Sequence, residues 1–435
     1  MSRTAEVRLW GRTIGAITLD EGSRIADFQY DEQFVDSGIQ IAPLMMPLSN
    51  KSYRFPRLSH ETFNGLPGML ADSLPDKYGN ALINAWLARA GRSPDSFTPV
   101  ERLCYTGERG MGALEYRPSK GPRTQKSSDI HISKLVSLAS EILSQRSELM
   151  ASFTTSKREQ ALREILQVGT SAGGARAKAV IAWNPKTGQV RSGQVKADPG
   201  FQYWLLKFDG VQNNRDREMA DPKGYGAIEF AYSKMAQDAG IEMSACKILE
   251  ENGRRHFMTQ RFDRSDNGQK FHVQTLGALA HLDYNQAGAH GYEEAFLVMR
   301  KLRLSISEIE QFFRRMVFNI IARNQDDHVK NISFMMDKAG NWALAPAYDM
   351  TYSYDPKGLW TSKHQMTMNG KQDGFDLDDF ETCAEIAVLK RGQFKQIIQE
   401  VDDVVSRWTD YADSVQVNPK QRDQIQGVLR VGKFL

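Results

Sequence analysis

The stretch from residue 308 to residue 351 restricts the fold of this chain more than any other part of its 435 residues. It begins with bulky apolar side chains that recur at three- and four-residue steps, which is the spacing of the buried face of a helix. These side chains are Phe312, Phe313, Met316, Val317, Ile320 and Ile321. The pattern predicts one long helix that ends near residues 323–324, followed by a dense polar loop from Asn324 to Asn331.

Two short strands are predicted after this loop, over Ile332–Met336 and Trp342–Ala345, with a glycine in the turn between them. If the last residue of the first strand pairs with the first residue of the second, the antiparallel register brings the residues after the second strand back beside the polar loop. Asp349 then lies at the same end of the hairpin as Asp326 and Asn331.

Two carboxylates, an amide, a histidine and a lysine would meet at this point, and such a cluster is costly unless a cation or a phosphate compensates the charges. A magnesium-bound nucleotide would do so, because phosphoryl transfer needs a carboxylate near the attacking hydroxyl and further oxygen ligands on the metal. Asp326 and Asn331 are five positions apart, as are the aspartate and asparagine of the protein-kinase catalytic loop. The alternative is a helix cap followed by a solvated turn, but a turn seldom gathers so many different polar groups between two apolar elements.

A glycine-rich segment lies upstream, from Gly169 to Lys178, directly before the predicted strand Ala179–Trp183. Its small residues, which include Gly173 and Gly174, would let backbone N–H groups approach an anion closely. The segment matches neither G-x-x-x-x-G-K-[ST] nor G-x-G-x-x-G, so without its context a flexible loop is the better interpretation.

Lys207 stands in the apolar strand Tyr203–Phe208, where a kinase places the lysine that pairs with the nucleotide phosphates. A lone lysine in a strand is more often a charge that protects a sheet edge. Glu229 lies on the predicted helix Tyr225–Ala239, and the order of strand lysine and helix glutamate matches the ion pair of protein kinases. The alternative for Glu229 is a solvated position on that helix.

The composition excludes several classes of protein. With 56 basic and 53 acidic side chains, the net charge of +3 predicts no global attraction to nucleic acid or membrane. Three widely separated cysteines argue against a disulfide framework and lack the spacing of zinc ligands. The N-terminal segment lacks the apolar core of a secretory signal, and no stretch approaches the roughly 20 apolar residues that cross a bilayer. We therefore expect a cytoplasmic protein that makes no membrane contact.

Several motifs along nearly the whole chain together resemble the HipA family of bacterial serine/threonine kinases, the toxins of type II toxin–antitoxin pairs. The motifs are Phe63–Gly68, Leu70–Asp76, Ser171–Lys178, Gln260–Arg264, Gln274–Gly277, Asn324–Asn331 and Ala347–Asp349. The string Asn324–Asn331 contributes most to the resemblance.

The resemblance implies an α+β, two-lobed protein-kinase-like fold with an N-terminal accessory domain. We expect the α+β accessory domain over residues 1–116, where strand patterns precede a helix, and a linker or exposed loop over the Pro-, Ser- and basic-rich residues 117–130. Residues 131–263 would form the N-lobe-like part with the glycine-rich loop and the nucleotide lysine. Residues 264–435 would form a mostly helical C-lobe with the catalytic loop.

The resemblance also implies that ATP and magnesium bind between the lobes. Asp326 would be the catalytic base and Asn331 and Asp349 the metal ligands, while His328 and Lys330 would shape the catalytic loop. The residues that would hold the nucleotide are Gly173, Gly174, Lys178, Lys207, Glu229, Gln260 and Phe262.

The activity implied by the resemblance is ATP-dependent phosphorylation of a protein, for which we expect a translation component, with growth arrest and persistence as the result. In the family a serine of the glycine-rich loop is autophosphorylated, which ejects the loop and silences the enzyme; Ser171 is the matching position. Family members commonly act with a small helix-turn-helix, HipB-like antitoxin that binds operator DNA. The kinase would then reach DNA through this partner.

Two other functions are compatible with the sequence. A small-molecule kinase of the aminoglycoside or lipid type uses similar loops of carboxylate and amide. A non-catalytic co-repressor subunit would need only the fold and a DNA-binding antitoxin. Its only direct support is the basic linker, and a solvated linker explains the same residues, which are Arg117, Lys120, Arg123 and Lys126.

Overall fold

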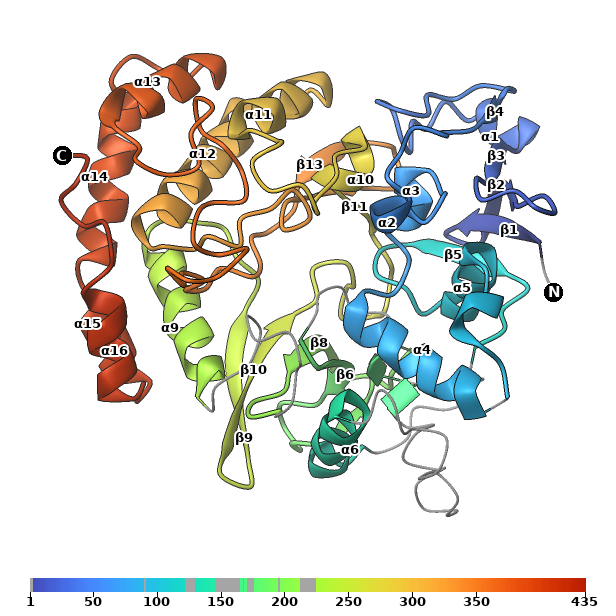
Figure 1. Cartoon of the computed structure of the whole chain (residues 1–435), viewed down its shortest axis with the longest axis horizontal. Coiled ribbons are helices and arrows are strands. Elements are labelled where there is room, and N and C mark those ends of the chain that lie inside the picture. The colour runs from blue at the N-terminus through green and yellow to red at the C-terminus, as the bar shows by residue number, and fades with distance from the viewer. Residues whose placement is uncertain are drawn as a thin grey trace.

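The computed structural model describes residues 3–89, 91–121, 130–144, 165–166, 168–169, 176–194, 196–211 and 224–435. Within these ranges the chain forms three sheets, each in a body with its own helices (Figure 1). Three hydrophobic clusters lie in the described ranges, one at each sheet. Two helices link the bodies, because α4 (Lys77–Arg89) packs in the cluster of the middle sheet and α9 (Tyr225–Asp238) packs in that of the C-terminal helices. No helix in the described ranges combines the length and the apolar character that a membrane span requires.

The N-terminal body is built on a five-stranded antiparallel sheet with the order β4-β3-β2-β1-β5. Its strands are β1 (Thr4–Leu9), β2 (Arg12–Thr18), β3 (Asp27–Tyr30), β4 (Ser52–Tyr53) and β5 (Leu114–Arg117). Every second residue of β1 is buried, as expected for a strand with one face on a core. The helices are α1 (Glu32–Val35), α2 (His60–Phe63), α3 (Gly68–Ala71), α4 (Lys77–Arg89), the 3-10 helix η1 (Pro94–Ser96) and α5 (Pro99–Thr106).

The middle body has a second five-stranded antiparallel sheet, with the order β7-β6-β8-β10-β9. Its elements are α6 (Ile132–Ser144), β6 (Lys178–Trp183), β7 (Val190–Ser192), β8 (Gln202–Lys207), α9 (Tyr225–Asp238), β9 (Cys246–Glu251) and β10 (Arg254–Gln260). The start of α9 lies very close to β10, because a Cβ atom on Gly226 would be 2.4 Å from the carbonyl oxygen of Arg255. Glycine at this position therefore lets the helix pack directly on the strand.

The C-terminal body is mostly helical, with a small sheet of order β11-β12-β13. The strands are β11 (His272–Thr275), β12 (Ser333–Met336) and β13 (Trp342–Leu344). The helices are α10 (Leu276–Ala280), α11 (Tyr292–Lys301), α12 (Ile306–Ile321), α13 (Leu377–Ile386), α14 (Gln393–Val405), α15 (Trp408–Ser414) and α16 (Pro419–Gln426). The hairpin predicted from the sequence is present, but β11 joins it as a third strand.

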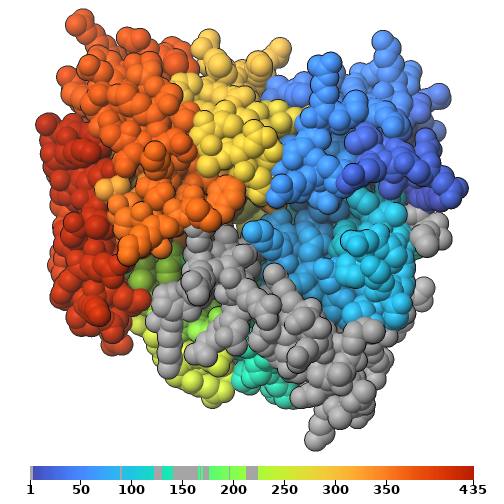
Figure 2. Space-filling model, viewed as in Figure 1, coloured from blue at the N-terminus to red at the C-terminus, as the bar shows by residue number. Residues whose placement is uncertain are grey.

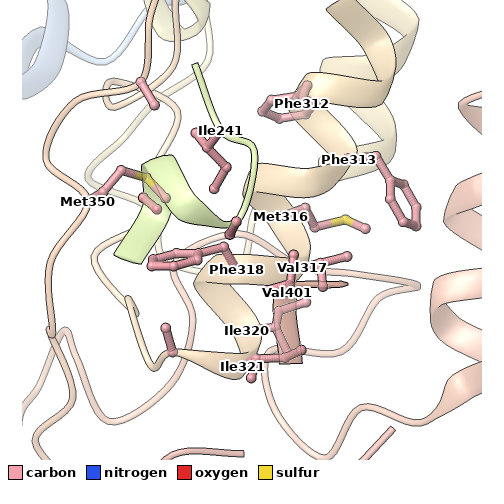
Figure 3. Close-up of a cluster of buried hydrophobic side chains, with 14 of the residues drawn as sticks. Ile241, Phe312, Phe313, Met316, Val317, Phe318, Ile320, Ile321, Met350 and Val401 are labelled. Atoms are coloured by element: carbon pink, nitrogen blue, oxygen red, sulfur yellow. The ribbon is translucent and has the colours of Figure 1, made fainter. Parts of the chain in front are cut away.

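Helix α12 occupies the centre of the C-terminal core. It begins with a capping box in which Ser305 and Glu308 satisfy each other's backbone N–H groups. Its apolar stripe is fully buried, with Ile241, Met350 and Val401 among the side chains around it (Figure 3). The rigid packing of this helix fixes the point at which the polar loop leaves it.

The N-terminal body packs directly on the C-terminal body. Helix α3 lies against α10 (Figure 1), and the blue N-terminal residues touch the yellow region that contains α10 in Figure 2. Met336 of β12 belongs to the hydrophobic cluster of the N-terminal body. Two indole N–H groups also cross the boundary, from Trp10 to the carbonyl oxygen of Lys270 at 2.8 Å and from Trp342 to that of Gln40 at 3.1 Å.

Candidate active site

The polar loop after α12 folds back on itself, so that its two ends meet. Asn331 closes it, because its Nδ2 donates to the backbone carbonyl oxygen of Asp326 at 2.7 Å and its backbone N–H donates to that of His328 at 2.8 Å. The side chain of Asp326 remains 44% exposed. Partial burial raises the pKa of Asp326, and the negative charge of Asp349 adds to this effect.

Asp349 reaches the same place from beyond the second strand of the hairpin. Met336 pairs with Trp342, which is the register predicted from the sequence. Beyond the second strand, Asp349 has a positive φ of 53°. Its Oδ1 lies 2.7 Å from Nζ of Lys207. Burial disfavours the charge of Asp349, but the positive charges of Lys207 and Lys178 outweigh burial and lower its pKa, so the carboxylate is ionised at neutral pH.

Two buried lysines face this carboxylate from the middle sheet. Lys178 at the start of β6 pairs with Lys207 at the end of β8, so both side chains stand on one face of the sheet. Nζ of Lys207 donates to Oε1 of Glu229 on α9 at 2.5 Å, which is the ion pair expected from the sequence. Burial lowers the pKa of Lys178 to about 8. Burial acts on Lys207 in the same direction, but Asp349 and Glu229 outweigh it and raise its pKa.

These side chains line one large cavity of about 1360 Å³ that lies between the three bodies. Of the predicted site residues, the cavity is lined by Lys178, Lys207, Gln260, Phe262, Asp326, His328, Lys330, Asn331 and Asp349. Phe262, just beyond β10, stacks on the ring of Tyr348 with centroids 5.8 Å apart. Glu229 is not a lining residue and lies behind Lys207, which it holds in place.

The two further loop residues have different surroundings. His328 points toward the carboxylate of Asp326, with Nε2 3.7 Å from Oδ1. Lys330 turns away from that carboxylate and forms an ion pair with Asp76 of the N-terminal body. Its ammonium also lies 4.8 Å from the ring centroid of Tyr284. His328 is therefore the loop side chain that lies near the predicted base.

Three predicted site residues, Ser171, Gly173 and Gly174, lie outside the described residues, as do residues 122–129 of the predicted linker. Arg176, directly after that part of the glycine-rich segment, is described. Its guanidinium lies 3.8 Å from the ring centroid of Tyr225, and its Nη1 is 3.8 Å from Oε2 of Glu229.

The sequence did not indicate that the N-terminal body contributes to this cavity. Asp72 and Asp76 line it from the segment between α3 and α4, and Asn80 lines it from the first turn of α4. Asp72 and Asp76 belong to the motif Leu70–Asp76, which contributed to the family resemblance but was assigned no place in the site. Their partners lie about 200 positions or more away in the sequence, and spacing along the chain carries no signal of such contacts.

The donor set fits a nucleotide with magnesium. Asp326, Asn331 and Asp349 offer the oxygen ligands that Mg²⁺ prefers, and the two lysines suit phosphate oxygens. In the described ranges, no three side chains of His, Cys, Asp or Glu form a self-contained metal site. Magnesium commonly binds one or two carboxylates and takes its other ligands from phosphates and water, so a site of this composition suits it.

The fold and this site place the protein in the protein-kinase-like class, with a sheet lysine that pairs with a helix glutamate and a mostly helical C-terminal body. The model of the HipA N-terminal domain matches residues 5–117, and that of the HipA-like C-terminal domain matches residues 170–408. The chain belongs to the HipA family.

Known relatives support this placement. HipA of Shewanella oneidensis MR-1, solved with HipB and its operator DNA, superposes with a TM-score of 0.69 over 99% of this chain and 97% of that chain, at 15% identity, and so shares the fold. "Putative kinase Y4mE" of Sinorhizobium fredii is 23% identical over 208 residues, which are 42% of this chain and 48% of that protein. A "Putative kinase" of Haemophilus influenzae is 26% identical over 134 residues, which are 28% of this chain and 39% of that protein. The chain thus matches about half, or less, of the length of these two curated relatives.

Proposed function

We propose that this protein is an ATP-dependent serine/threonine protein kinase that acts as the toxin of a toxin–antitoxin pair. The observation that carries the proposal is the meeting of Asp326, Asn331 and Asp349 at one cavity, opposite the buried Lys178 and Lys207. Membership of the HipA family and the kinase names of two relatives support it.

In the proposed reaction, the γ-phosphoryl group of ATP passes to a protein hydroxyl and ADP leaves. Asp326 orients the hydroxyl and accepts its proton, a task that suits a carboxylate with a raised pKa. Asn331 and Asp349 would hold magnesium, which would neutralise charge on the phosphates. Lys178 and Lys207 contact the phosphates, while Gln260 and Phe262 provide the wall against the adenine.

We further propose that the substrate is a translation component, that its phosphorylation causes growth arrest and persistence, and that autophosphorylation of Ser171 silences the enzyme. A phosphate on the glycine-rich segment would place nearly two negative charges where ATP phosphates bind. Mass spectrometry of protein incubated with ATP tests this, with Ser171→Ala as the comparison. Recovery of the same phosphorylated peptide from that variant would exclude Ser171.

The proposed partner is a small helix-turn-helix antitoxin that connects the protein to operator DNA, in the cytoplasm. The support is the shared fold with the Shewanella protein, whose structure contains HipB and operator DNA. Three free cysteines agree with a reducing compartment. A net charge of +3 gives the chain itself no strong general attraction to DNA, so contact through the antitoxin is the simpler arrangement.

Transfer from radiolabelled ATP tests the proposed activity. Asp326→Asn should abolish labelling of protein bands but leave ATP affinity nearly unchanged, because only the group that orients the hydroxyl is lost. The matched control is Asp403→Asn, which changes an exposed carboxylate on α14. This variant should label protein bands as the wild type does. Full labelling by Asp326→Asn would refute the assignment, and phosphoproteomics of cells that express either form would identify the substrate.

A further inference from the structure

Two aspartates of the N-terminal body, Asp72 and Asp76, stand at the end of α3 and the start of α4 and face the polar loop. Asp72 accepts two hydrogen bonds from Thr275, from its backbone N–H at 2.8 Å and from its hydroxyl at 2.9 Å. Both oxygens of this carboxylate are thus used to fix one residue at the junction of β11 and α10.

The two residues after Thr275 hold the backbone of the loop. Leu276 donates its N–H to the carbonyl oxygen of Ile332 at 2.7 Å, and Gly277 donates to that of Val329 at 3.1 Å. These carbonyl groups flank Asn331, the residue that closes the loop onto Asp326. A shift of Thr275 would therefore be transmitted directly to the residues proposed to bind metal and substrate.

Asp76 acts on the loop through a side chain. It forms an ion pair with Lys330, and the exposed fractions of the two side chains are only 13% and 20%. The carbonyl oxygen of Lys330 accepts a hydrogen bond from the hydroxyl of Tyr348 at 2.8 Å. Lys330 is thus fixed at both its side chain and its backbone, and its charge is neutralised away from Asp326.

The two bodies are packed closely enough to keep these contacts in register. A Cβ atom on Gly68 would lie 2.3 Å from the carbonyl oxygen of Ala278, so α3 is seated directly on α10. The N–H of Gly68 donates to Nε2 of His281 at 3.0 Å. Burial lowers the pKa of His281 to about 4, so the ring is neutral and Nε2 can accept this bond.

We propose that Asp76 and Asp72 are positioning residues of the active site, through which the N-terminal body holds the loop Asp326–Asn331 in its working geometry. The accessory domain would then be part of the catalytic machinery. The effect on catalysis rests on the kinase function proposed above, whereas the holding of the loop does not.

Hydrogen–deuterium exchange of the full chain tests the holding role without any need for activity. Asp76→Asn keeps the size of the side chain but removes the charge opposite Lys330, so peptides over residues 324–332 should exchange about tenfold faster or more. The matched control is Asp36→Asn, which changes an exposed aspartate of the same body. This variant should exchange at the wild-type rate over residues 324–332. Unchanged exchange in Asp76→Asn would overturn the proposal. If that variant does not fold, Lys330→Met removes the same ion pair from the other side.

The split between kcat and nucleotide affinity separates positioning from a general structural role. We expect Asp76→Asn to lower kcat about 10- to 100-fold while the Kd for ATP changes by less than about twofold. Asp76→Glu should keep most of the wild-type kcat. The double variant of Asp76→Asn and Lys330→Met should have a kcat no lower than that of either single variant, because the two substitutions remove the same interaction.

The possible results are distinguishable. Full kcat in Asp76→Asn, or a loss that appears only in ATP affinity, would refute the positioning role. If the wild type transfers no phosphate to any protein, the proposed function fails, and the exchange experiment still decides whether the aspartates hold the loop.

Discussion

His364 and Asp327 form a fully buried pair, with Nδ1 of the histidine 2.8 Å from Oδ2 of the aspartate. Nη1 of Arg430 lies 2.9 Å from the other ring nitrogen, Nε2. Because arginine only donates hydrogen bonds, Nε2 must accept, and the proton of the neutral ring is on Nδ1 and is donated to Asp327. The residue next to the proposed base is thus fixed from the C-terminal side of the molecule.

Asp327→Ala should lower the free energy of unfolding by about 3–5 kcal/mol, because it leaves several buried donors without an acceptor. Oδ2 of Asp327 also accepts from the hydroxyl of Tyr292 at 2.6 Å, and Oδ1 accepts from the N–H of Gln365 at 2.7 Å. Urea unfolding measures the change. Asp403→Ala, on the exposed face of α14, should change stability by less than about 0.5 kcal/mol, and an equally small loss for Asp327→Ala would contradict this account.

Nucleotide affinity should depend on pH through Lys178. Burial lowers the pKa of this lysine to about 8 in the free protein, and a bound phosphate would raise it again by stabilising the ammonium. Affinity should therefore be constant below pH of about 8 and fall as the pH rises above it. Lys207, whose pKa is raised, stays charged over this range.

Calorimetry with a non-hydrolysable ATP analogue between pH of about 6.5 and 9.5 measures this dependence. Lys178→Arg is the control, since arginine does not titrate in this range and should give a flat profile. The same fall in that variant as in the wild type would assign the pH dependence to another group.

Asp349→Asn should weaken binding of magnesium–ATP about tenfold or more, which corresponds to about 1.4 kcal/mol. The variant loses an ionised oxygen ligand but keeps the size of the side chain. Titration with ATP in EDTA should show a much smaller change, because Asp349 acts on the nucleotide through the metal in this proposal. Equal losses with and without magnesium would instead point to the ion pair with Lys207 as the cause.

Gly68→Ala should destabilise the contact between the N-terminal and C-terminal bodies by about 1–3 kcal/mol, because the new methyl group would overlap the carbonyl oxygen of Ala278. Gly427→Ala is a suitable comparison. That glycine ends α16 with a φ of −69°, and a Cβ there meets its nearest neighbour at an ordinary 3.5 Å. It should change the free energy of unfolding by less than about 1 kcal/mol. Similar losses in the two variants would indicate a general cost of the added methyl group.

The local features of the site were predictable because they depend on regular spacing. The apolar stripe of α12 determined where the helix ends, and the pairing of Met336 with Trp342 followed from a short turn. The ion pair of Lys207 with Glu229 was anticipated from the order of a strand and a helix. Each of these relations lies within one element or between neighbours along the chain.

Relations between distant elements could not be predicted from the sequence. The strand β11 joins the hairpin from about 60 positions upstream, and its own pattern gave no register. The contacts of Asp76 with Lys330 and of Arg430 with His364 join segments whose proximity is decided by the packing of whole bodies. Spacing along the chain contains no measure of such packing.

Arg430 reaches His364 from 66 positions further along the chain. A ribosome that makes this protein therefore completes the aspartate, the histidine and all of α12 before it adds the arginine that joins them. In a growing chain the pair of Asp327 and His364 therefore lacks this last anchor until residue 430 has been added.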